Sequence, residues 1–444
     1  MARITPMSGF PEYLPAGRMV EQRVVDTLRE VFELHGFASV QTRAVETLQM
    51  LNRKGEITKE VYTVRRIHAK ENDTDTLGLH FDLTVPFARY VLENAGRLQF
   101  PFRRYQIQPA WRGERPQEGR YREFWQADID IVGQGTLAFH HDAEVVLVML
   151  EALQRLHNEL GIPEVLLHAN NRKLVQGFYE GLGVTDPLAA IQIVDKLNKV
   201  GSQTVRELLA AQAVMPDAIE RILKLASIRT SNDAFIEQVY ALGVSNTLVE
   251  TGVAELAAFI KDLSARFPNQ VMADLKIARG LDYYTGSVFE IDIPALPTLG
   301  TVCAGGRYDA LATDGKNSYP GVGISFGITR VLAPLLTRGA VTANRPVPSA
   351  VLVAVDAEET RNVAATVATA LRAHGVACEV SPTALAYGKQ IMTADRRGIP
   401  YVWFGGLLGS VKDIRTGEQM DADANCWMPP TADLKPAIVY DAIR

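Results

Sequence analysis

Cysteine is scarce in this chain of 444 residues, and its spacing argues against a disulfide framework or a zinc site. The three cysteines, Cys303, Cys378 and Cys426, lie far apart and form no CxxC pair. That distribution is typical of proteins kept in a reducing compartment. The N-terminal run MARITPMSGFPEYLP lacks the apolar core of a secretory signal. We therefore expect a cytoplasmic location.

Long apolar runs and metal-ligand clusters are also missing from the sequence. No apolar run approaches the roughly 18 residues that a membrane-spanning helix needs, so no membrane partner is expected. His140 and His141 are adjacent, but no third ligand follows them at metal spacing, and they are expected to begin a helix. The sequence thus predicts no metal site among its side chains.

The chain has no excess of positive charge and no phosphate-binding loop of the Walker type. A formal net charge of −5 gives no general attraction to nucleic acid, although local basic patches remain compatible with it. No GxxxxGK[ST] motif occurs, and the nearest run, DGKNS, has Asn after the lysine. If the chain binds ATP, arginines and a metal ion must hold the phosphates.

The chain does contain a cluster of arginines in the first of two predicted strands and in the loop between them, within the segment FRRYQIQPAWRGERPQEGRYREFWQADIDIVG of residues 102–133. Bidentate guanidinium groups suit phosphate and carboxylate oxygens. The six arginines of the cluster are Arg103, Arg104, Arg112, Arg115, Arg120 and Arg122.

The second strand of this segment, residues 123–132, alternates between polar and apolar side chains. Gln126, Asp128 and Asp130 share one face, and apolar side chains share the other. A row of carboxylates and an amide beside arginines predicts a pocket for a charged, polar ligand. The alternative is an amphipathic edge hairpin whose polar face is solvated.

Two further motifs supply polar side chains, and neither of them is decisive alone. Asp82 and Thr84 lie two apart at a strand end, so both can enter one pocket. ARGLDYYTGSVFE places Arg279 beside a glycine and before Tyr283 and Tyr284, a pattern that also suits a buried turn with core tyrosines.

Two more motifs combine glycine with arginine or tyrosine. GTVCAGGRYD has two glycines before Arg307 and Tyr308, which allows the backbone to approach a ligand closely. GVGISFGITR predicts a strand followed by a helix that carries Arg330 in its first turns.

The predicted elements divide the chain into an α+β part, a helical insertion and a small α/β part. A helix over residues 17–35 precedes strands whose long connections favour a mainly antiparallel or mixed sheet. We assign residues 1–336 to this first domain, with the insertion at about 185–265. A segment rich in glycine and proline, 337–349, predicts a linker to an α/β domain over 350–444. The expected strands of the first domain are 37–42, 78–82, 102–108, 123–132, 288–293 and 321–326.

Together these segments resemble the histidyl-tRNA synthetases, which are class II aminoacyl-tRNA synthetases. Residues 18–46 are similar to class II motif 1, which builds the dimer interface in that family. FRRYQIQPAWRGERPQEGRYREF is similar to motif 2 and GVGISFGITRV to motif 3. ARGLDYYTGSVFE and GTVCAGGRYD resemble two histidine-specific peptides, and GKQIMTADRRGIP resembles part of the anticodon-binding domain.

The chain departs from many bacterial members of that family at a few positions. Asp130 stands where many carry Glu, and residues 82–84 read Asp-Leu-Thr where many carry Glu-Gly-Thr. Both changes keep the carboxylate and the hydroxyl. The loop at residues 405–410 is shorter than usual.

The resemblance implies a class II catalytic domain at 1–336, an anticodon-binding domain at 350–444, and a homodimer. The implied reaction is the ATP-dependent ligation of L-histidine to the 3′ end of tRNA(His) through a histidyl-adenylate, with Mg²⁺ on the phosphates. Arg112 and Arg279 would be catalytic, and Arg115 and Gln117 would meet the acceptor end of the tRNA. ATP would contact Arg112, Glu114 and Arg330. Histidine would contact Asp82, Thr84, Arg112, Gln126, Asp130, Arg279, Tyr283, Tyr284 and Tyr308.

Two alternatives come from other functional classes. A non-catalytic, synthetase-like regulatory subunit of histidine biosynthesis would lack the tail domain and lose the histidine-specific peptides. A synthetase-like sensor of uncharged tRNA would keep the tail but lose the phosphate-binding arginines. This chain has the tail, both peptides and the three arginines Arg112, Arg279 and Arg330.

We expect Arg279→Ala to lower kcat for adenylation much more than it raises KM for histidine. A guanidinium that neutralises charge in the transition state contributes roughly 2.7–4 kcal/mol, by analogy with oxyanion-hole donors. Steady-state adenylation kinetics on the folded variant measure the effect, and an unchanged kcat would refute the catalytic role.

Overall fold

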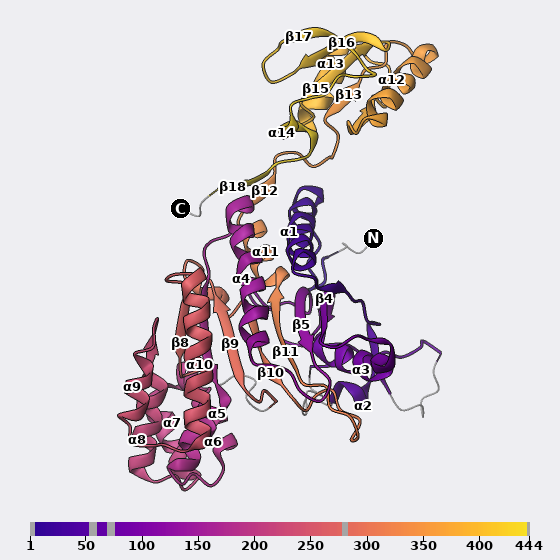
Figure 1. Cartoon of the computed structure of the whole chain (residues 1–444). Helices are drawn as coiled ribbons and strands as arrows, with labels where there is room; N and C mark the ends of the chain where they lie inside the picture. The colour runs from indigo at the N-terminus through magenta and orange to yellow at the C-terminus, as the bar shows by residue number, and fades with distance from the viewer. Residues whose placement is uncertain (1–4, 53–59, 69–75, 278–282, 442–444) are drawn as a thin grey trace. The chain divides into compact units, whose positions relative to one another are not determined.

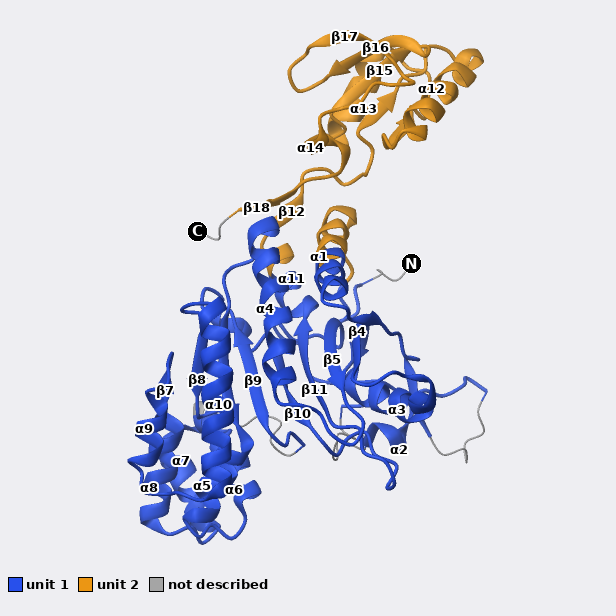
Figure 2. Cartoon of the chain, viewed as in Figure 1, with its two compact units in different colours: residues 1–11, 25–334 blue, residues 12–24, 335–444 orange. Residues whose placement is uncertain are grey.

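The computed structural model describes residues 5–52, 60–68, 76–277 and 283–441. The chain divides into two compact units, Met1–Pro11 with Val25–Pro334 and Glu12–Val24 with Leu335–Arg444 (Figure 2). The predicted N-terminal helix is present as α1 (Pro15–Leu34), and the division falls within it. Each unit contains its own sheet.

A nine-stranded sheet forms the centre of the first unit (Figure 1). The pairs β1–β4 and β6–β8 are parallel and the other neighbours are antiparallel, which confirms the expected mainly antiparallel sheet. In spatial order the strands are β1 (Ala38–Ser39), β4 (Phe102–Trp111), β5 (Glu123–Val132), β11 (Gly321–Gly327), β10 (Cys303–Tyr308), β9 (Ser287–Asp292), β6 (Leu166–Asn171), β8 (Val271–Asp274) and β7 (Arg229–Thr230).

Strand β5 shows how the sheet separates its two faces. Ala127, Ile129 and Ile131 are fully buried, as their alternation with polar residues predicts. Two long helices pack on the sheet: α4 (His140–Leu160) contacts β5 and β11, and α10 (Thr247–Arg266) contacts β6 and β8 (Figure 1). Helix α4 begins at His140, as expected from the sequence.

The remaining elements of this unit are short strands and helices around the sheet. The expected strand at 78–82 is present only as β3 (Leu77–Leu79), which pairs with β2 (Val45–Thr47), and the strand expected at 37–42 is only β1. The helices are α2 (Leu48–Leu51), α3 (Thr84–Asn94), η2 (Ala95–Arg97), α5 (Arg172–Gly181), α6 (Pro187–Val194), α7 (Leu197–Ala211), α8 (Pro216–Ser227), α9 (Phe235–Tyr240), η3 (Pro297–Leu299) and α11 (Ile328–Thr337).

The second unit contains a five-stranded sheet in the order β14, β13, β15, β16, β17. The parallel pairing of β13 with both β14 and β15 forms a βαβ arrangement, as expected for an α/β domain, and β16 and β17 form an antiparallel hairpin. The elements are β13 (Val351–Val353), η4 (Glu358–Thr360), α12 (Arg361–Ala373), β14 (Cys378–Val380), α13 (Tyr387–Arg396), β15 (Tyr401–Gly405), β16 (Leu408–Asp413), β17 (Gln419–Asp423) and α14 (Thr431–Leu434).

The segment expected to be a linker contains regular structure. Strand β12 (Val341–Ala343) lies within 337–349 and pairs antiparallel with β18 (Ile438–Tyr440) near the end of the chain. Among the residues that the structure describes, no helix is both long and apolar enough to cross a membrane.

A buried histidine, His168, joins the neighbouring strands β9, β6 and β8 of the nine-stranded sheet. His168 on β6 meets Asp274 of β8 through Nδ1 at 3.1 Å and Asp292 of β9 through Nε2 at 3.2 Å. Burial alone would lower the pKa of His168, but hydrogen bonds to the two carboxylates outweigh it and raise the pKa to about 9. The protonated ring therefore stabilises the folded state, fully below its unfolded pKa near 6.5 and progressively less as pH rises through about 9.

We expect His168→Gln to destabilise the protein by about 1–3 kcal/mol near pH 6, because it removes the cation that bonds both the buried Asp274 and the more exposed Asp292. The difference from the unmodified chain should shrink as pH approaches 9. Thermal unfolding across this pH range measures it. His35→Gln is the matched control, since His35 pairs with Glu151 at a more exposed position. Equal pH profiles for the two variants would contradict the role assigned to His168.

Candidate functional site

Two adjoining cavities lie over the polar faces of β5, β10 and β11. The larger has a volume of about 350 Å³ and the smaller about 140 Å³. Arg112, Gln126, Ala304 and Ser325 line both. The two cavities therefore share a wall, and ligands in them would meet at these four residues.

The smaller cavity brings together the side chains that the sequence placed around histidine. Its walls carry carboxylates, hydroxyls, an amide and one guanidinium, a mixture suited to a small zwitterion with a polar side chain. The predicted residues found there are Asp82, Thr84, Arg112, Gln126, Asp130, Tyr283, Tyr284 and Tyr308. Arg279, the remaining member of the predicted set, lies outside the described residues.

Asp130 and Tyr308 line one end of the smaller cavity, and Arg104 lies beneath Asp130. The Tyr308 hydroxyl donates to Asp130 Oδ1 at 2.6 Å, and Arg104 Nη2 lies 2.7 Å from Asp130 Oδ2. Burial, and then the charge of Asp130, raise the pKa of Tyr308 well above its usual value, so the hydroxyl keeps its proton. Asp130 thus retains a fixed orientation toward the cavity.

Arg104 belongs to the cluster of arginines in the sequence, but it lies on β4 and not in the loop between β4 and β5. Its side chain is fully buried beneath the pocket, and its guanidinium carbon lies 4.2 Å from the centroid of the Phe87 ring. The contact with Asp130 is an ion pair without hydrogen-bond geometry, and Nε and Nη1 find no hydrogen-bond partner within the described ranges.

Glycines on the neighbouring strands make room for these side chains. Gly323 lies opposite Asp130 in the β5–β11 register, and a Cβ there would sit 2.0 Å from Asp130 Oδ1. A Cβ at Gly306 would sit 2.8 Å from the Tyr284 ring. The glycines of GTVCAGGRYD and GVGISFGITR are thus required by the packing of the pocket walls.

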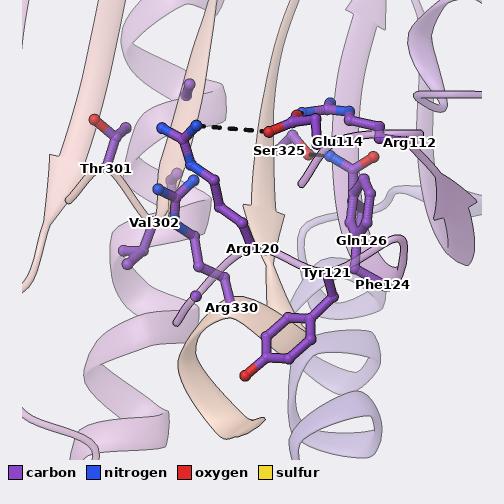
Figure 3. Close-up of a pocket in the computed structure, with 14 residues that line it drawn as sticks. Arg112, Glu114, Arg120, Tyr121, Phe124, Gln126, Thr301, Val302, Ser325 and Arg330 are labelled. Carbon is purple, nitrogen blue, oxygen red and sulfur yellow. Dashed lines mark hydrogen bonds and ion pairs between the residues drawn. The ribbon is translucent and has the colours of Figure 1, made fainter. Parts of the chain in front are cut away.

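The larger cavity is lined by three arginines and one carboxylate (Figure 3). Arg120 Nη1 lies 3.5 Å from Glu114 Oε2, the interaction dashed in Figure 3, and Arg112 Nη1 lies 3.9 Å from Glu114 Oε1. Arg330, near the start of α11 as predicted, donates from Nε to the Leu299 carbonyl at 2.9 Å. This concentration of guanidinium groups suits a polyphosphate.

Arg112 is held at the boundary between the cavities. Its Nε donates to the Phe81 carbonyl at 3.0 Å, and its guanidinium carbon lies 5.0 Å from the centroid of the Phe124 ring. These contacts fix the side chain from two sides, so its remaining nitrogens can address ligands in both cavities.

Sequence reasoning missed several residues that line the cavities. Arg120, Tyr121 and Phe124 belong to the larger cavity and Asp128 to the smaller. The alternation of β5 did place Asp128 on the correct face, but the residue was not assigned a role. Backbone carbonyls and ring faces give no signal in a single sequence, which explains the omission of Tyr121 and Phe124.

The other predicted residues of the arginine cluster have separate partners. Arg103 pairs with Glu144 of α4, and Arg122 donates to the backbone carbonyls of Glu114 and Ser8. Arg115 and Gln117 are exposed on the loop between β4 and β5 and line neither cavity.

Helix α4 contains a group of side chains that could ligate a metal, contrary to the sequence expectation that His140 and His141 lack a third ligand. Their ring nitrogens and the Glu144 carboxylate lie within 4.8 Å of one another. Glu144 is also paired with the Arg103 guanidinium, whose charge opposes a metal cation. This group therefore does not fit a cation site.

Comparisons with known proteins agree with the geometry. Residues 9–331 match the family model of histidyl-tRNA synthetase, and residues 349–406 match an anticodon binding domain. The chain is 58% identical to the histidine–tRNA ligase of Cutibacterium acnes, with 99% of each chain covered. It is 51% identical to that of Micrococcus luteus, again over 99% of each.

A solved structure extends the agreement to three dimensions. The histidyl-tRNA synthetase of Nostoc sp. PCC 7120 superposes with a TM-score of 0.83 at 32% identity, covering 96% of this chain and 98% of that one. The match includes both the sheet that carries the two cavities and the tail. This chain belongs to the histidyl-tRNA synthetase family.

Proposed function

We propose that the two cavities carry out the reaction of histidine–tRNA ligases, in which ATP and L-histidine form histidyl-adenylate and the histidyl group passes to tRNA(His). The shared wall carries this proposal. A cavity lined by arginines adjoins a cavity lined by carboxylates and tyrosines, and Arg112 lines both. A nucleotide and an amino acid in these cavities would meet at the Arg112 guanidinium, which can bind both the carboxylate of the amino acid and the α-phosphate of the nucleotide.

In the first step, a carboxylate oxygen of histidine attacks the α-phosphorus of ATP. The new P–O bond forms as the bond to the β-phosphate bridging oxygen breaks, and pyrophosphate leaves. Arg112 binds the carboxylate and the α-phosphate, while Arg120 and Arg330 neutralise the outer phosphates. Arg279 is proposed as a further cation on the α-phosphate.

In the second step, the 3′-hydroxyl of the terminal adenosine attacks the carbonyl carbon of the adenylate. The ester bond forms, the mixed anhydride bond breaks, AMP leaves with the electron pair, and the hydroxyl proton passes to the departing phosphate or to solvent. The same arginines stabilise the departing phosphate.

Glu114 is the carboxylate that fits Mg²⁺ in the larger cavity. Mg²⁺ prefers hard oxygen ligands and is commonly bound by one or two carboxylates together with substrate phosphates. Glu114 is the carboxylate that lines the larger cavity, and the phosphates of ATP would offset the charges of the neighbouring Arg120 and Arg112, so Glu114 would supply the protein oxygen. The ion would contribute charge neutralisation on the phosphates.

Specificity for histidine is proposed to come from the Asp130 end of the smaller cavity. Asp130, Tyr308 and Tyr284 offer hydrogen bonds to the two ring nitrogens, and a pocket with such partners rejects apolar isosteres strongly. Asp82, Thr84 and Gln126 hold the α-amino group. The Oε1 atom of Gln126 is buried and finds no hydrogen-bond partner in the described part of the chain, which leaves it available as an acceptor.

The organisation of the chain completes the proposal. Residues 1–336 form the catalytic domain with its insertion at 185–265, and 350–444 form the domain that binds the anticodon, a role supported by the match to an anticodon binding domain. We also propose a homodimer formed through residues 18–46 and a cytoplasmic location.

A regulatory subunit without catalysis is less supported, because relatives called histidine–tRNA ligase align over 99% of this chain.

Pyrophosphate exchange into ATP tests the reaction with each amino acid supplied singly. We expect exchange only with L-histidine and only with Mg²⁺. Arg112→Ala should reduce the rate by about a hundredfold or more, since it removes a contact to developing charge. The exposed Arg97 lies outside both cavities, and Arg97→Ala should leave the rate unchanged. Exchange with a different amino acid, or none with histidine, would refute the assignment.

Arg115 is expected to read the acceptor end of the tRNA. In this family tRNA(His) carries an extra 5′ guanosine, and Arg115 is exposed on the loop between β4 and β5, the second of which lines both cavities. We expect Arg115→Ala to leave adenylation nearly intact and to shrink the penalty for removing that guanosine, by roughly 1–3 kcal/mol if a good base contact is lost.

Charging of both tRNA forms by both proteins gives a double-mutant cycle for this contact. Gln117→Ala is the matched companion, because Gln117 lies on the same loop and can also contact a base edge. Additive effects of Arg115 and the guanosine would show that recognition lies elsewhere.

A further inference from the structure

Asp128 is a carboxylate of the smaller cavity to which the reaction as proposed assigns no role. It is 2% exposed, yet it lines the cavity between Gln126 and Asp130 on the same face of β5. Its Oδ1 accepts a hydrogen bond from the Ser325 hydroxyl, which in turn accepts from Gln126 Nε2 at 2.9 Å. Asp128 is thus joined by hydrogen bonds to the amide proposed to bind the α-amino group.

Charged neighbours face Asp128 from three elements. Arg104 on β4 lies 4.0 Å from Asp128 Oδ2, but its closer contact, at 2.7 Å, is with Asp130. Asp130 lies two residues along β5, and Asp82 approaches from the segment before α3. Arg112, Tyr283, Tyr284 and Tyr308 line the same cavity, and the uncharged Gln106 is the cross-strand neighbour of Asp128 on β4.

Three carboxylates, Asp82, Asp128 and Asp130, line the cavity, against two guanidinium groups, Arg112 in its wall and Arg104 beneath it, so negative charge is in excess. Arg104 compensates Asp130, whereas Asp82 and Asp128 both face the space proposed for the α-amino group. Burial, followed by the charges of Asp130 and Asp82, raises the pKa of Asp128 to about 7, against the opposing influence of Arg104 and Ser325. Two carboxylates around one site ionise together only when a positive charge lies between them.

We propose that Asp128 is a further histidine-binding residue, which shares the α-ammonium group of the substrate with Asp82 and holds a proton in its place when the cavity is empty. The inference rests on the proposed function of that cavity. Histidine binding then releases a proton from Asp128: the ammonium group enters, the carboxyl ionises, and the proton passes to solvent.

The sign of the pH dependence follows from this exchange. Below about pH 7 the empty pocket holds a proton on Asp128, so binding of histidine must displace it and affinity falls. The loss approaches about tenfold for each pH unit. Above the pKa of Asp128 the carboxylate is already ionised, and affinity no longer depends on its titration.

Calorimetry of L-histidine binding to the full-length protein, in buffers of different ionisation enthalpy, counts the released protons. At about pH 6 the unmodified protein should release close to one proton more than Asp128→Asn, and at about pH 8.5 the two should release the same number. Asp128→Asn should also bind histidine about ten- to a hundredfold more weakly at the higher pH, because a charge-assisted contact is lost. Asp262→Asn, at an exposed position, is the control for loss of a carboxylate elsewhere.

A second ligand tests the location of the effect without any mutation. Imidazolepropionate is histidine without its α-amino group. Once the protons bound by each free ligand's own imidazole are subtracted, its binding to the unmodified protein at about pH 6 should release about one proton fewer than histidine. Equal proton release for the two ligands would overturn the inference, as would equal release by Asp128→Asn. Failure of the unmodified protein to bind histidine at all would overturn the proposed function itself, and the two failures are thereby distinguished.

Discussion

The buried guanidinium of Arg104 is the interaction on which the rest of the site depends. It lies beneath the pocket, fully enclosed, against the Phe87 ring and the Asp130 carboxylate. A buried carboxylate without a cation is unfavourable, and removal of one partner of such a pair typically costs about 3–5 kcal/mol. Because Asp130 also accepts from Tyr308, the position of Arg104 orients both side chains at the end of the smaller cavity that is proposed to select histidine.

The consecutive residues Arg307 and Tyr308 connect this site to the opposite side of the sheet. Tyr308 faces the pocket, while Arg307 pairs with the buried Asp142 of α4 at 2.6 Å and donates to the carbonyls of Leu137 and Ala138. Helix α4 is thereby anchored to the same strand that supplies the pocket tyrosine. The rigidity of the site comes from contacts on both faces of one strand.

The sequence allowed the site to be predicted where local patterns determine it. The alternation along β5 placed Gln126, Asp128 and Asp130 on one face, and the structure has β5 with the expected ends. The same analysis could not separate the roles of the clustered arginines. Arg103 finds its partner 41 residues along the chain, and such distant partners are not visible in a single sequence. Strands β6 and β8 were missed for a similar reason, since their pairing joins segments about a hundred residues apart.

The motifs shared with the family predicted site residues that the alternation of polar and apolar residues could not indicate. They identified Arg330 and the tyrosines of the pocket, which the structure brings to the two cavities. They did not indicate β12, because the residues of that segment are typical of a linker and its structure depends on pairing with β18. Local composition thus describes a segment poorly when its partner lies at the other end of the domain.

The common wall of the two cavities has a consequence for the fate of the reaction intermediate. Histidyl-adenylate joins covalently the two groups that the cavities are proposed to hold separately, so it would make both sets of contacts while losing the translational and rotational freedom of only one molecule. It should therefore be retained more tightly than either substrate. Retention keeps a hydrolysable anhydride inside the protein until the acceptor end arrives, so the four shared residues protect the product of the first step as well as join the substrates that form it.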